Sequence, residues 1–247
     1  MRRRTPLVID DIQPEHCTTD LRLHILRGIP FLADLTDQDI AAVNQLARES
    51  GYEAGEMIYF TGDRAAHWCV VASGKVKLLR HTASGQDVLL DILKLGEFFG
   101  SLGALDYEAY PETAQALTPC CVLRIAVEDF KAMLRRYPSV ALAVLDIVAN
   151  RLTTAHEMVR QLSAHSVEQR VAVALLKLAE KLGEAQPDGL LIQVPLSRQD
   201  LAALTGTTTE TVSRVMSQFR EARLIQSGRQ WVAITDLSRL RAIAEGV

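Results

Sequence analysis

The stretch 197–225 constrains the fold most, because it predicts two short helices joined by a glycine turn. Ser197 can cap the first helix, and the aspartate three residues later suits that helix's positive end. Gly206 supplies the turn, and Thr207 or Thr208 can cap the second helix. Four apolar residues of the second helix recur at i, i+3, i+4 and i+7 and predict one buried stripe: Val212, Val215, Met216 and Phe219.

Polar side chains occupy the opposite, solvent-facing side of this second helix. A helix that is held by its neighbour and presents such side chains suits the major groove of DNA, so the pattern is typical of a helix-turn-helix. The alternatives are that Glu210 completes a capping box with Thr207 and that Arg214 is an ordinary surface charge. The DNA-facing residues predicted at this helix are Thr208, Thr209, Glu210, Ser213, Arg214 and Ser217.

A short hairpin follows the helix-turn-helix, with apolar runs at 224–226 and 230–234 on either side of a turn. A hairpin that follows a helix-turn-helix is called a wing, and it can reach the phosphate backbone of DNA. We therefore predict that Arg229 at its tip, and Arg198 beside the first helix, contact phosphates rather than bases. The net charge of −3 argues against indiscriminate nucleic-acid binding. The arginines of this segment nevertheless leave a locally basic face.

At 247 residues the chain is long enough for two domains. No apolar run approaches the length that spans a membrane, and the opening MRRRTPLVIDD lacks the apolar core of a signal peptide. We therefore expect a cytoplasmic protein with no membrane partner. Residues 1–20 are expected to form an N-terminal arm.

The spacing of the four cysteines matches neither a C-x-x-C pair nor a zinc-binding pattern, so no metal site is expected. Adjacent residues of a strand point to opposite faces, so a bond between neighbouring cysteines would be strained. We expect these residues to be small, buried and reduced: Cys17, Cys69, Cys120 and Cys121.

Residues 21–135 are expected to form a β-roll domain, which makes the fold class α+β. Between 52 and 126, short apolar runs alternate with glycines, as in an antiparallel sandwich or roll. The interior of such a roll is a common place for a small ligand. Before the predicted strands, residues 17–51 show helical periodicity that is broken at Gly28–Pro30, and a second helix is predicted from Leu35 to Gly51.

Residues 127–184 are helical again, and their middle carries an apolar seam with steps of 3, 4, 3, 4 and 3. This spacing is typical of the a and d positions of a coiled coil, whereas a helix packed on its own domain would carry a broader stripe with a period of 3.6. We predict a dimerisation helix over 136–164 and a winged helix-turn-helix domain over 165–247. The predicted dimer interface is Leu145, Val148, Leu152, Ala155, Val159 and Leu162.

The order of roll, long helix, hinge and winged helix-turn-helix resembles the Crp/Fnr family of bacterial transcription regulators over roughly 21–244. The matching motifs are GEFFGSLGAL at 96–105, YPETAQAL at 110–117 and LTGTTTETVSRVMSQF at 204–219. The resemblance implies a homodimer that binds a palindromic site on double-stranded DNA and contacts RNA polymerase. YPETAQAL resembles the Fnr branch and the nitric-oxide-responsive Dnr branch. The order E-T-V-S-R resembles the Fnr branch, which implies a TTGAT-type half-site.

The residues that hold cAMP in the cAMP-responsive branch differ here. In that branch a Glu holds the ribose and an Arg-Ser pair holds the phosphate, and the matching positions are Ser101, Thr113 and Ala114. They supply neither a cation nor the aligned donors that a cyclic phosphate needs, so no cAMP response is expected. The effector pocket implied by the resemblance comprises Gly100, Ser101, Leu102, Thr113 and Ala114.

The oxygen-sensing Fnr branch holds an iron–sulfur cluster with closely spaced N-terminal cysteines. Only Cys17 lies in that region here, so we expect no such cluster, and no other cofactor is evident. Haem, which is associated with the Dnr-like branch, is one alternative for the sensed signal, and regulation by abundance without an effector is another. The histidines that could ligate haem are His16, His24, His67 and His81.

A dimeric DNA-binding regulator accounts for every segment of the chain. The alternative is a ligand-binding module whose helix-turn-helix serves a protein partner, and the outward Glu210, Ser213 and Arg214 argue against it. An enzyme is not expected, because the sequence shows no Ser-His-Asp order, paired carboxylates or nucleotide-binding glycine fingerprint.

Overall fold

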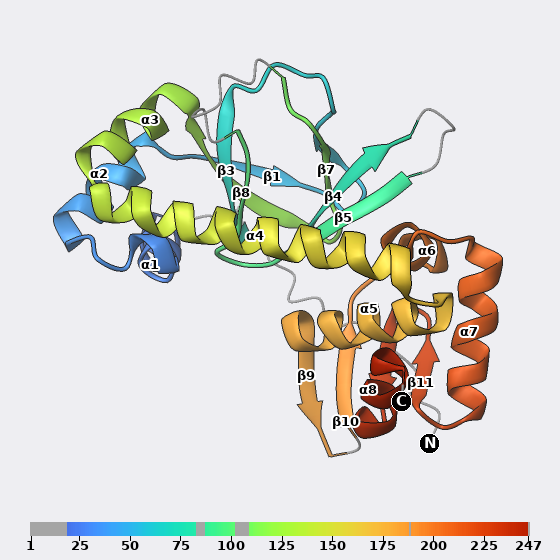
Figure 1. The fold of residues 1–247 in the computed structure, drawn as a ribbon. Helices are drawn as coiled ribbons and strands as arrows, with labels where there is room; N and C mark the ends of the chain where they lie inside the picture. The colour runs from blue at the N-terminus through green and yellow to red at the C-terminus, as the bar shows by residue number, and fades with distance from the viewer. Residues whose placement is uncertain (1–18, 83–86, 102–108, 188, 247) are drawn as a thin grey trace. The chain divides into compact units, whose positions relative to one another are not determined.

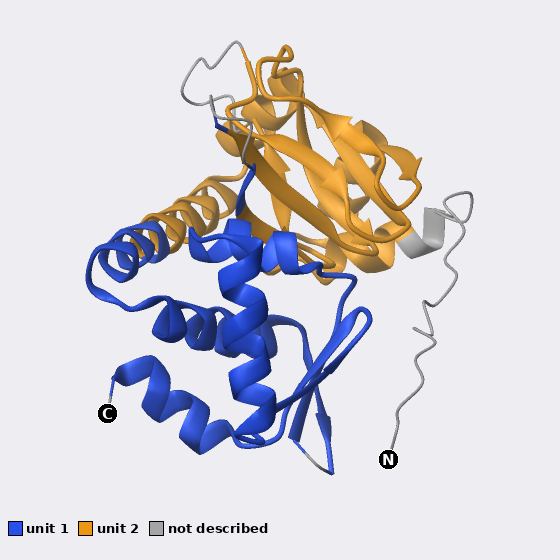
Figure 2. Cartoon of the chain, turned by 90° about the vertical axis from the view of Figure 1, so that its right-hand side faces the viewer, with its two compact units in different colours: residues 1–9, 82–89, 154–247 blue, residues 10–81, 90–153 orange. Residues whose placement is uncertain are grey.

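The computed structural model describes residues 19–82, 87–101, 109–187 and 189–246. The chain divides into two compact units (Figure 2). The one built mainly from residues before Thr154, orange in Figure 2, is called the first unit here, and the one built mainly from Thr154 onward, blue in Figure 2, is called the second unit. Within the described ranges, no helix is both long and apolar enough to cross a membrane.

The first unit contains two four-stranded antiparallel sheets (Figure 1). Across the first sheet the order is β1 (Arg48–Tyr52), β8 (Cys120–Ala126), β3 (His67–Ser73) and β6 (Phe98–Gly100). Across the second sheet it is β2 (Met57–Tyr59), β7 (Thr113–Ala116), β4 (Val76–His81) and β5 (Asp87–Leu93). The predicted antiparallel roll and the α+β class are therefore confirmed.

Both faces of the first sheet are covered, which explains why β3 and β8 read as continuous apolar runs in the sequence. On β3, Trp68 and Val70 face a core shared with helices, whereas Cys69 faces the core between the two sheets. On β8, Cys121 and Cys120 divide in the same way. The prediction that the adjacent cysteines point to opposite faces is confirmed.

Helices cover the outer face of this sheet: α1 (Thr19–Arg27), the 3₁₀ turn η2 (Pro30–Leu32), α2 (Asp37–Leu46) and α3 (Val127–Arg136). Their apolar sides bury Leu26, Ile40 and Phe130 in one core with Trp68. The ring of Phe130 stacks on Trp68 with centroids 4.4 Å apart. The predicted break at Gly28–Pro30 is confirmed, because η2 separates α1 from α2.

The prediction that the second helix continues to Gly51 is wrong. The helix α2 ends at Leu46, and β1 begins at Arg48. The five residues of β1 pair with β8, from Arg48 opposite Arg124 to Tyr52 opposite Cys120. These partners lie about seventy residues further along the chain, so the backbone bonds that make the segment a strand come from tertiary pairing rather than from its own pattern.

The long helix α4 (Pro138–Ala164) is continuous and lies close to the predicted range of 136–164. Its first turns bury Val140 and Val144 in the helical core of the first unit. The next helix, α5 (Val167–Leu182), begins with a capping box. Ser166 Oγ accepts from the Gln169 N–H (3.2 Å), and Gln169 Oε1 accepts from the Ser166 N–H (2.8 Å). The predicted break after residue 164 is therefore the point where a separately capped helix begins.

The second unit combines helices with one four-stranded sheet in the order β11-β12-β10-β9. The hairpin of β11 (Ile225–Gly228) and β12 (Trp231–Ile234) was predicted from the sequence, whereas β9, β10 and the last helix were not. The elements are α5, β9 (Gly183–Gln186), β10 (Gly189–Gln193), α6 (Arg198–Thr205), α7 (Thr209–Glu221), β11 (Ile225–Gly228), β12 (Trp231–Ile234) and α8 (Leu237–Glu245).

Candidate nucleic-acid interface

The helix α6 and the turn after it are fixed by local hydrogen bonds. Ser197 Oγ accepts from the Asp200 N–H (3.0 Å), and Asp200 Oδ2 accepts from the Ser197 N–H (2.8 Å). The predicted cap is therefore a reciprocal capping box. Gly206 ends the helix in the left-handed conformation, with φ at 61°, which is the backbone freedom expected of this glycine.

The second helix, α7, starts from Thr208, one of the two predicted caps. Thr208 Oγ1 accepts from the Thr211 N–H (3.2 Å) and lies 2.9 Å from Thr211 Oγ1. The alternative in which Thr207 and Glu210 form a capping box is therefore wrong, because the cap lies one residue later. The Glu210 carboxylate is exposed and is not used in this cap.

The two faces of α7 differ as the spacing predicts. Val212, Met216 and Phe219 are fully buried, and Val215 is nearly so. On the other face Glu210 and Arg214 are exposed, as are Thr208 and Thr209, and the two serines are half-buried. Ser213 Oγ donates to the Thr209 carbonyl (2.8 Å), so the lone pairs of this hydroxyl stay available to an outside donor. The structure brings together on α7 and its N-cap all six residues predicted to face DNA there.

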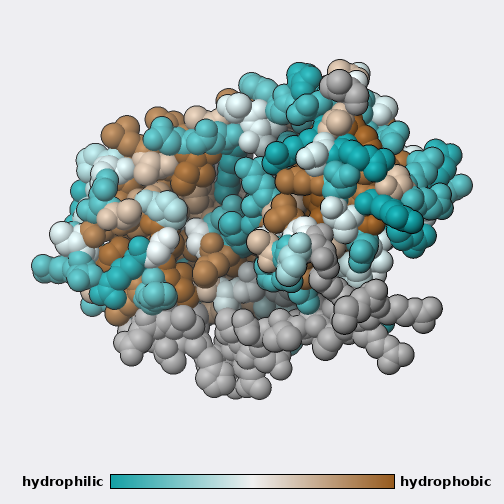
Figure 3. All heavy atoms as spheres, turned by 90° about the horizontal axis from the view of Figure 1, so that it is seen from below, coloured by the Kyte–Doolittle hydropathy of each residue, from teal (hydrophilic) through white to brown (hydrophobic). Residues whose placement is uncertain are grey.

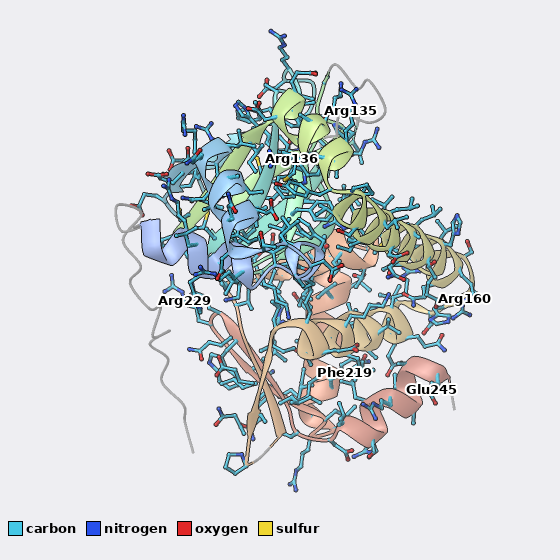
Figure 4. The ribbon with its side chains drawn as sticks, turned by 90° about the vertical axis from the view of Figure 1, so that its left-hand side faces the viewer. Arg135, Arg136, Arg160, Phe219, Arg229 and Glu245 are labelled. Atoms are coloured by element: carbon cyan, nitrogen blue, oxygen red, sulfur yellow. The ribbon has the colours of Figure 1, made fainter. Side chains whose placement is uncertain are left out.

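The wing ends in a two-residue turn made of Arg229 and Gln230, and Gln230 has φ at 67°. Figure 4 shows Arg229 at the tip of the hairpin and Phe219 on α7. Arg198, the other predicted phosphate contact, is half-buried and donates to Ser227 Oγ on β11 (3.4 Å). Burial lowers the pKa of its guanidinium, and the nearby charge of Arg220 lowers it further. The phosphate roles of Arg198 and Arg229 remain predictions.

The predicted dimer seam lies largely exposed on α4. Leu145, Leu152 and Val159 have 60%, 56% and 63% of their surface accessible, and Leu162 has 45%. Ala155 is also exposed, whereas Val148 is half-buried against the helical core of the first unit. Leu142, which the sequence analysis did not include, is 64% exposed one turn before Leu145.

Single exposed apolar residues are ordinary on a protein surface. Figure 3 shows apolar patches, in brown, on one face of the molecule. A row of five large ones along a single helix is not ordinary and is typical of an interaction surface. The row begins with the two leucines at 142 and 145 and continues along every second turn, so its spacing follows the heptad. Its role in dimerisation stays a prediction.

The end of α4 also contacts the helix-turn-helix. A Cβ built on Gly206 would lie 2.8 Å from Leu162 Cδ2, so this leucine packs on the turn. The Arg170 guanidinium on α5 donates to the carbonyls of Leu162 (3.4 Å), His165 (3.3 Å) and Gly206 (3.5 Å). Arg170 was not predicted, because it bonds a segment 36 residues away that no local pattern identifies.

The residues of the effector pocket implied by the resemblance belong to the first unit, and their role in binding stays a prediction. Ser101, Thr113 and Ala114 are buried, and Leu102 lies outside the described residues. Thr113 Oγ1 accepts from the Thr61 N–H (3.0 Å) and lies 3.1 Å from Thr61 Oγ1. Gly100 has φ at 85°, and a Cβ there would meet the His67 carbonyl at 2.7 Å, so its role is to let two strands approach.

Aromatic side chains fill much of the core between the two sheets. Tyr59 stacks on Tyr110 with ring centroids 3.7 Å apart, and the ring centroid of Phe99 lies 6.0 Å from that of Tyr59. Tyr59 Oη donates to Glu112 Oε1 (3.1 Å). Burial raises the pKa of Glu112, although the bond from Tyr59 and the charges of Arg151 and Arg80 oppose that rise. This cluster was not predicted from the sequence, because Tyr59 lies 53 residues before Glu112 and no local pattern links them.

The described histidines and cysteines do not form a metal centre. Within the described ranges there is no group of three or more His, Cys, Asp or Glu side chains that could hold a metal ion. His24 is exposed on α1, His67 is half-buried at the start of β3, and His81 ends β4 in the other sheet. Cys69, Cys120 and Cys121 are buried cysteines of β3 and β8. His16 and Cys17 lie outside the described residues, and haem ligation stays untested.

The comparisons with known proteins agree with this architecture. Residues 49–137 match the cyclic nucleotide-binding domain family, and residues 169–243 match the Crp-like helix-turn-helix domain family. The "Cyclic AMP receptor protein" of Thermus thermophilus is 33% identical over 222 residues, which cover 90% of this chain and 100% of that protein. The "Transcriptional activator protein FnrA" of Stutzerimonas stutzeri is 26% identical over 222 residues, with 90% and 91% covered.

Among solved structures, FixK2 from Bradyrhizobium japonicum superposes with a TM-score of 0.71 at 24% identity, covering 80% of this chain and 96% of that one. It shares the fold. The roll, the long helix and the winged helix-turn-helix define a DNA-binding transcription regulator rather than an enzyme. Because a relative is 33% identical along nearly the whole chain, the protein belongs to the Crp/Fnr family.

Proposed function

We propose that this protein is a homodimeric regulator that reads an inverted-repeat DNA site through α7. The observation that carries the proposal is the division of α7 into a fully buried apolar stripe and an exposed polar face. The stripe fixes the helix on its own unit. The outward face then presents Glu210 and Arg214, which belong neither to the buried stripe nor to the cap of the helix. A rigidly held helix with free polar side chains is what direct readout in the major groove requires.

The dimer in this proposal forms through the exposed apolar row on α4. Two copies that pair these rows around a twofold axis would remove five large apolar side chains per chain from water. Twofold symmetry then requires an inverted repeat, with half-sites about one helical turn, or 10 base pairs, apart. RNA polymerase is the further partner that membership of this family leads us to propose.

In the half-site, Arg214 donates to guanine O6 and N7, and Glu210 accepts from a cytosine N4 amine. The two side chains stand four residues apart, so they project from one face of α7. Ser213 between them is small and has its proton engaged by the Thr209 carbonyl, so it can only accept a hydrogen bond from a base. The similarity to the Fnr branch supports a TTGAT-type half-site.

We also propose that the roll gives no response to cAMP, although one relative is named a cyclic AMP receptor protein. The Thr113 hydroxyl is engaged by Thr61, and Ser101 is buried. The signal at the roll is therefore haem, a redox or gas signal or another small molecule, or else the protein is controlled by its abundance alone.

Selection from a random duplex library tests the function. The wild-type chain should enrich inverted repeats of a TTGAT-type half-site, and Arg214→Ala should relax the preference at guanine and cost about 1–3 kcal/mol of binding free energy. Arg135→Ala, an exposed arginine on α3, is the matched control and should leave the selected sequence unchanged. If the folded wild-type chain enriches no sequence, the helix-turn-helix serves a protein partner and the alternative function holds.

A further inference from the structure

A pocket of about 360 Å³ lies within the second unit, beside the DNA-facing elements. It opens among α5, the segment that leads from β10 into α6, and the wing hairpin of β11 and β12. Its volume falls at the lower end of the range typical of small-molecule sites, which is about 300–1,000 Å³. Neither the predicted function nor the family resemblance assigns it a task.

The inner wall of this pocket is apolar. The residues that form it are buried side chains of α5, β10, the segment after β10 and α6: Leu175, Leu178, Ile192, Val194 and Leu201. Trp231 and Val232 on β12 close one side and are half-buried. The ring of Trp231 lies against Gly228, where an added Cβ would clash with Trp231 Nε1, so the wing is closely packed at this side.

The charged groups that line the pocket are both cations. They are Arg198 and Arg229, and among the described lining residues there is no Asp or Glu. Arg198 is half-buried, and its hydrogen bond goes to the neutral Ser227 hydroxyl. No carboxylate of a described residue forms an ion pair with it, and the charge that acts on it comes from Arg220, a further cation. A partly desolvated guanidinium in such surroundings favours an anion.

A DNA phosphate would satisfy the guanidinium but not the rest of the pocket. The sugar–phosphate backbone carries its phosphates on a polar chain and has no apolar body to fill a recess walled by leucine, isoleucine and valine. An anion joined to an apolar body matches both features at once, since its charge pairs with Arg198 while its body lies against Leu178 and Trp231.

We propose that this pocket, here called the wing pocket, binds an organic monoanion with an apolar body, such as a medium-chain carboxylate, through Arg198. A carboxylate held there occupies the cation that the proposed DNA complex uses for a phosphate. The ligand therefore competes with DNA, and the second unit carries a regulatory site of its own. The competition rests on the proposed function, whereas the binding itself does not.

Decanoate, used below its micelle-forming concentration, is the first probe, and the readout is tryptophan fluorescence of the full chain. Trp231 lines the pocket, whereas Trp68 is fully buried in the core of the first unit. We expect a saturable change with decanoate that is lost in Trp231→Phe. 1-Decanol, which has the body without the charge, and inorganic phosphate, which has the charge without the body, should each bind at least about tenfold more weakly.

Variants of Arg198 test the assignment of the anion. Arg198→Gln should weaken decanoate at least about tenfold, since hydrogen bonds to charged groups contribute about 1.5–3 kcal/mol and 1.4 kcal/mol is a factor of ten. Arg198→Lys keeps the charge and should retain most of the affinity. Arg214→Gln, an exposed residue of α7 that does not line the pocket, should leave decanoate binding unchanged while it weakens DNA binding. Equal binding by wild type and Arg198→Gln overturns the proposal, as does equal binding of phosphate.

The last measurement is DNA affinity with saturating decanoate. We expect the dissociation constant of the wild type to rise at least about tenfold and that of Arg198→Gln to stay constant. Unchanged DNA affinity with decanoate bound would overturn the competition. If the protein binds no DNA without decanoate, the proposed function fails, and the fluorescence result still decides whether the wing pocket binds the anion.

Discussion

Replacing Leu152 tests the link between the exposed row on α4 and dimerisation. Leu152 lies near the middle of the row, and 56% of its surface is accessible in the single chain. Its neighbours in the row, Leu145 and Val159, are exposed to a similar degree, so none of them contributes much to the packing of its own unit. A substitution here should therefore act on the dimer more than on the fold of one chain.

The size of the effect follows from the exposed fraction. Complete burial of a leucine side chain contributes about 1.5–3 kcal/mol. If pairing buries the accessible half, it adds roughly 1–1.5 kcal/mol per chain, or about 2–3 kcal/mol for the symmetric dimer. Leu152→Ala loses most of this, which raises the dimer dissociation constant up to about 30- to 150-fold. Leu152→Glu should act more strongly, because it also buries an unpaired charge at the interface.

Sedimentation equilibrium over a range of protein concentrations measures both constants. Asn150→Glu is the matched control, because residue 150 is exposed on α4 outside the apolar row and should leave the dimer intact. Thermal unfolding of each variant shows whether the single chain has been disturbed. If Leu152→Glu sediments as a dimer with the constant of the wild type, the exposed row is not the dimer interface and the exposure of these residues has another cause.

Three further predictions concern the roll, the wing and the cysteines. Titration calorimetry should detect no micromolar binding of cAMP, because the Thr113 hydroxyl is engaged within the roll. Binding at that level would contradict the proposal that the roll does not respond to cAMP. Arg229→Gln should weaken binding to all DNA sequences alike and reduce the salt dependence by about one unit of slope. A change in the preferred sequence would instead assign Arg229 to base readout. Anaerobically purified protein should show no iron–sulfur absorption, since burial raises the pKa of Cys69 and Cys120 to about 12 and opposes the thiolate that ligation needs. An iron–sulfur spectrum would show that this reasoning fails.

The elements that local patterns specify were predicted well. The stripe of α7, the caps of α6 and α7 and the left-handed Gly206 all depend on residues within one or two helical turns. Such signals act before any tertiary contact forms, so the sequence alone contains them. The same holds for the length of α4, whose 27 residues include no glycine, and whose proline stands at the first position.

The elements that depend on pairing with another segment, rather than on a pattern of their own, were missed. β1 and β9 are short and polar, with sequences RESGY and GEAQ, and each is a strand because a neighbour supplies its hydrogen bonds. The predicted heptad seam likewise includes Val148, although the helical core of the first unit partly covers this residue. It omits Leu142, although this residue is exposed. A period in the sequence identifies an apolar face but not the surface that covers it. The Tyr59–Glu112 contact spans 53 residues and has no local signal.

The turn of the helix-turn-helix allows two physical causes of a mutational effect to be separated. Gly206 adopts φ at 61°, and a Cβ there would meet Leu162 Cδ2 at 2.8 Å. The backbone term should dominate, because a left-handed conformation costs a residue with a Cβ about 1–2 kcal/mol, whereas the end of a leucine side chain can move aside. Gly206→Ala should thus destabilise α6 and α7 by about 1–2 kcal/mol, and Gly206→Asn by less, since asparagine tolerates this conformation.

Native-state hydrogen exchange of the α6 and α7 amides in the full chain measures this free energy locally. The double variant Gly206→Ala with Leu162→Ala decides between the causes, because it removes the close contact and leaves the backbone as it is. If the backbone dominates, the two substitutions should be nearly additive, with a coupling below about 0.5 kcal/mol. Restoration of protection by Leu162→Ala would show that packing against the end of α4 limits this turn. The reading helix would then be positioned by contact with α4 rather than by the conformation of its own glycine.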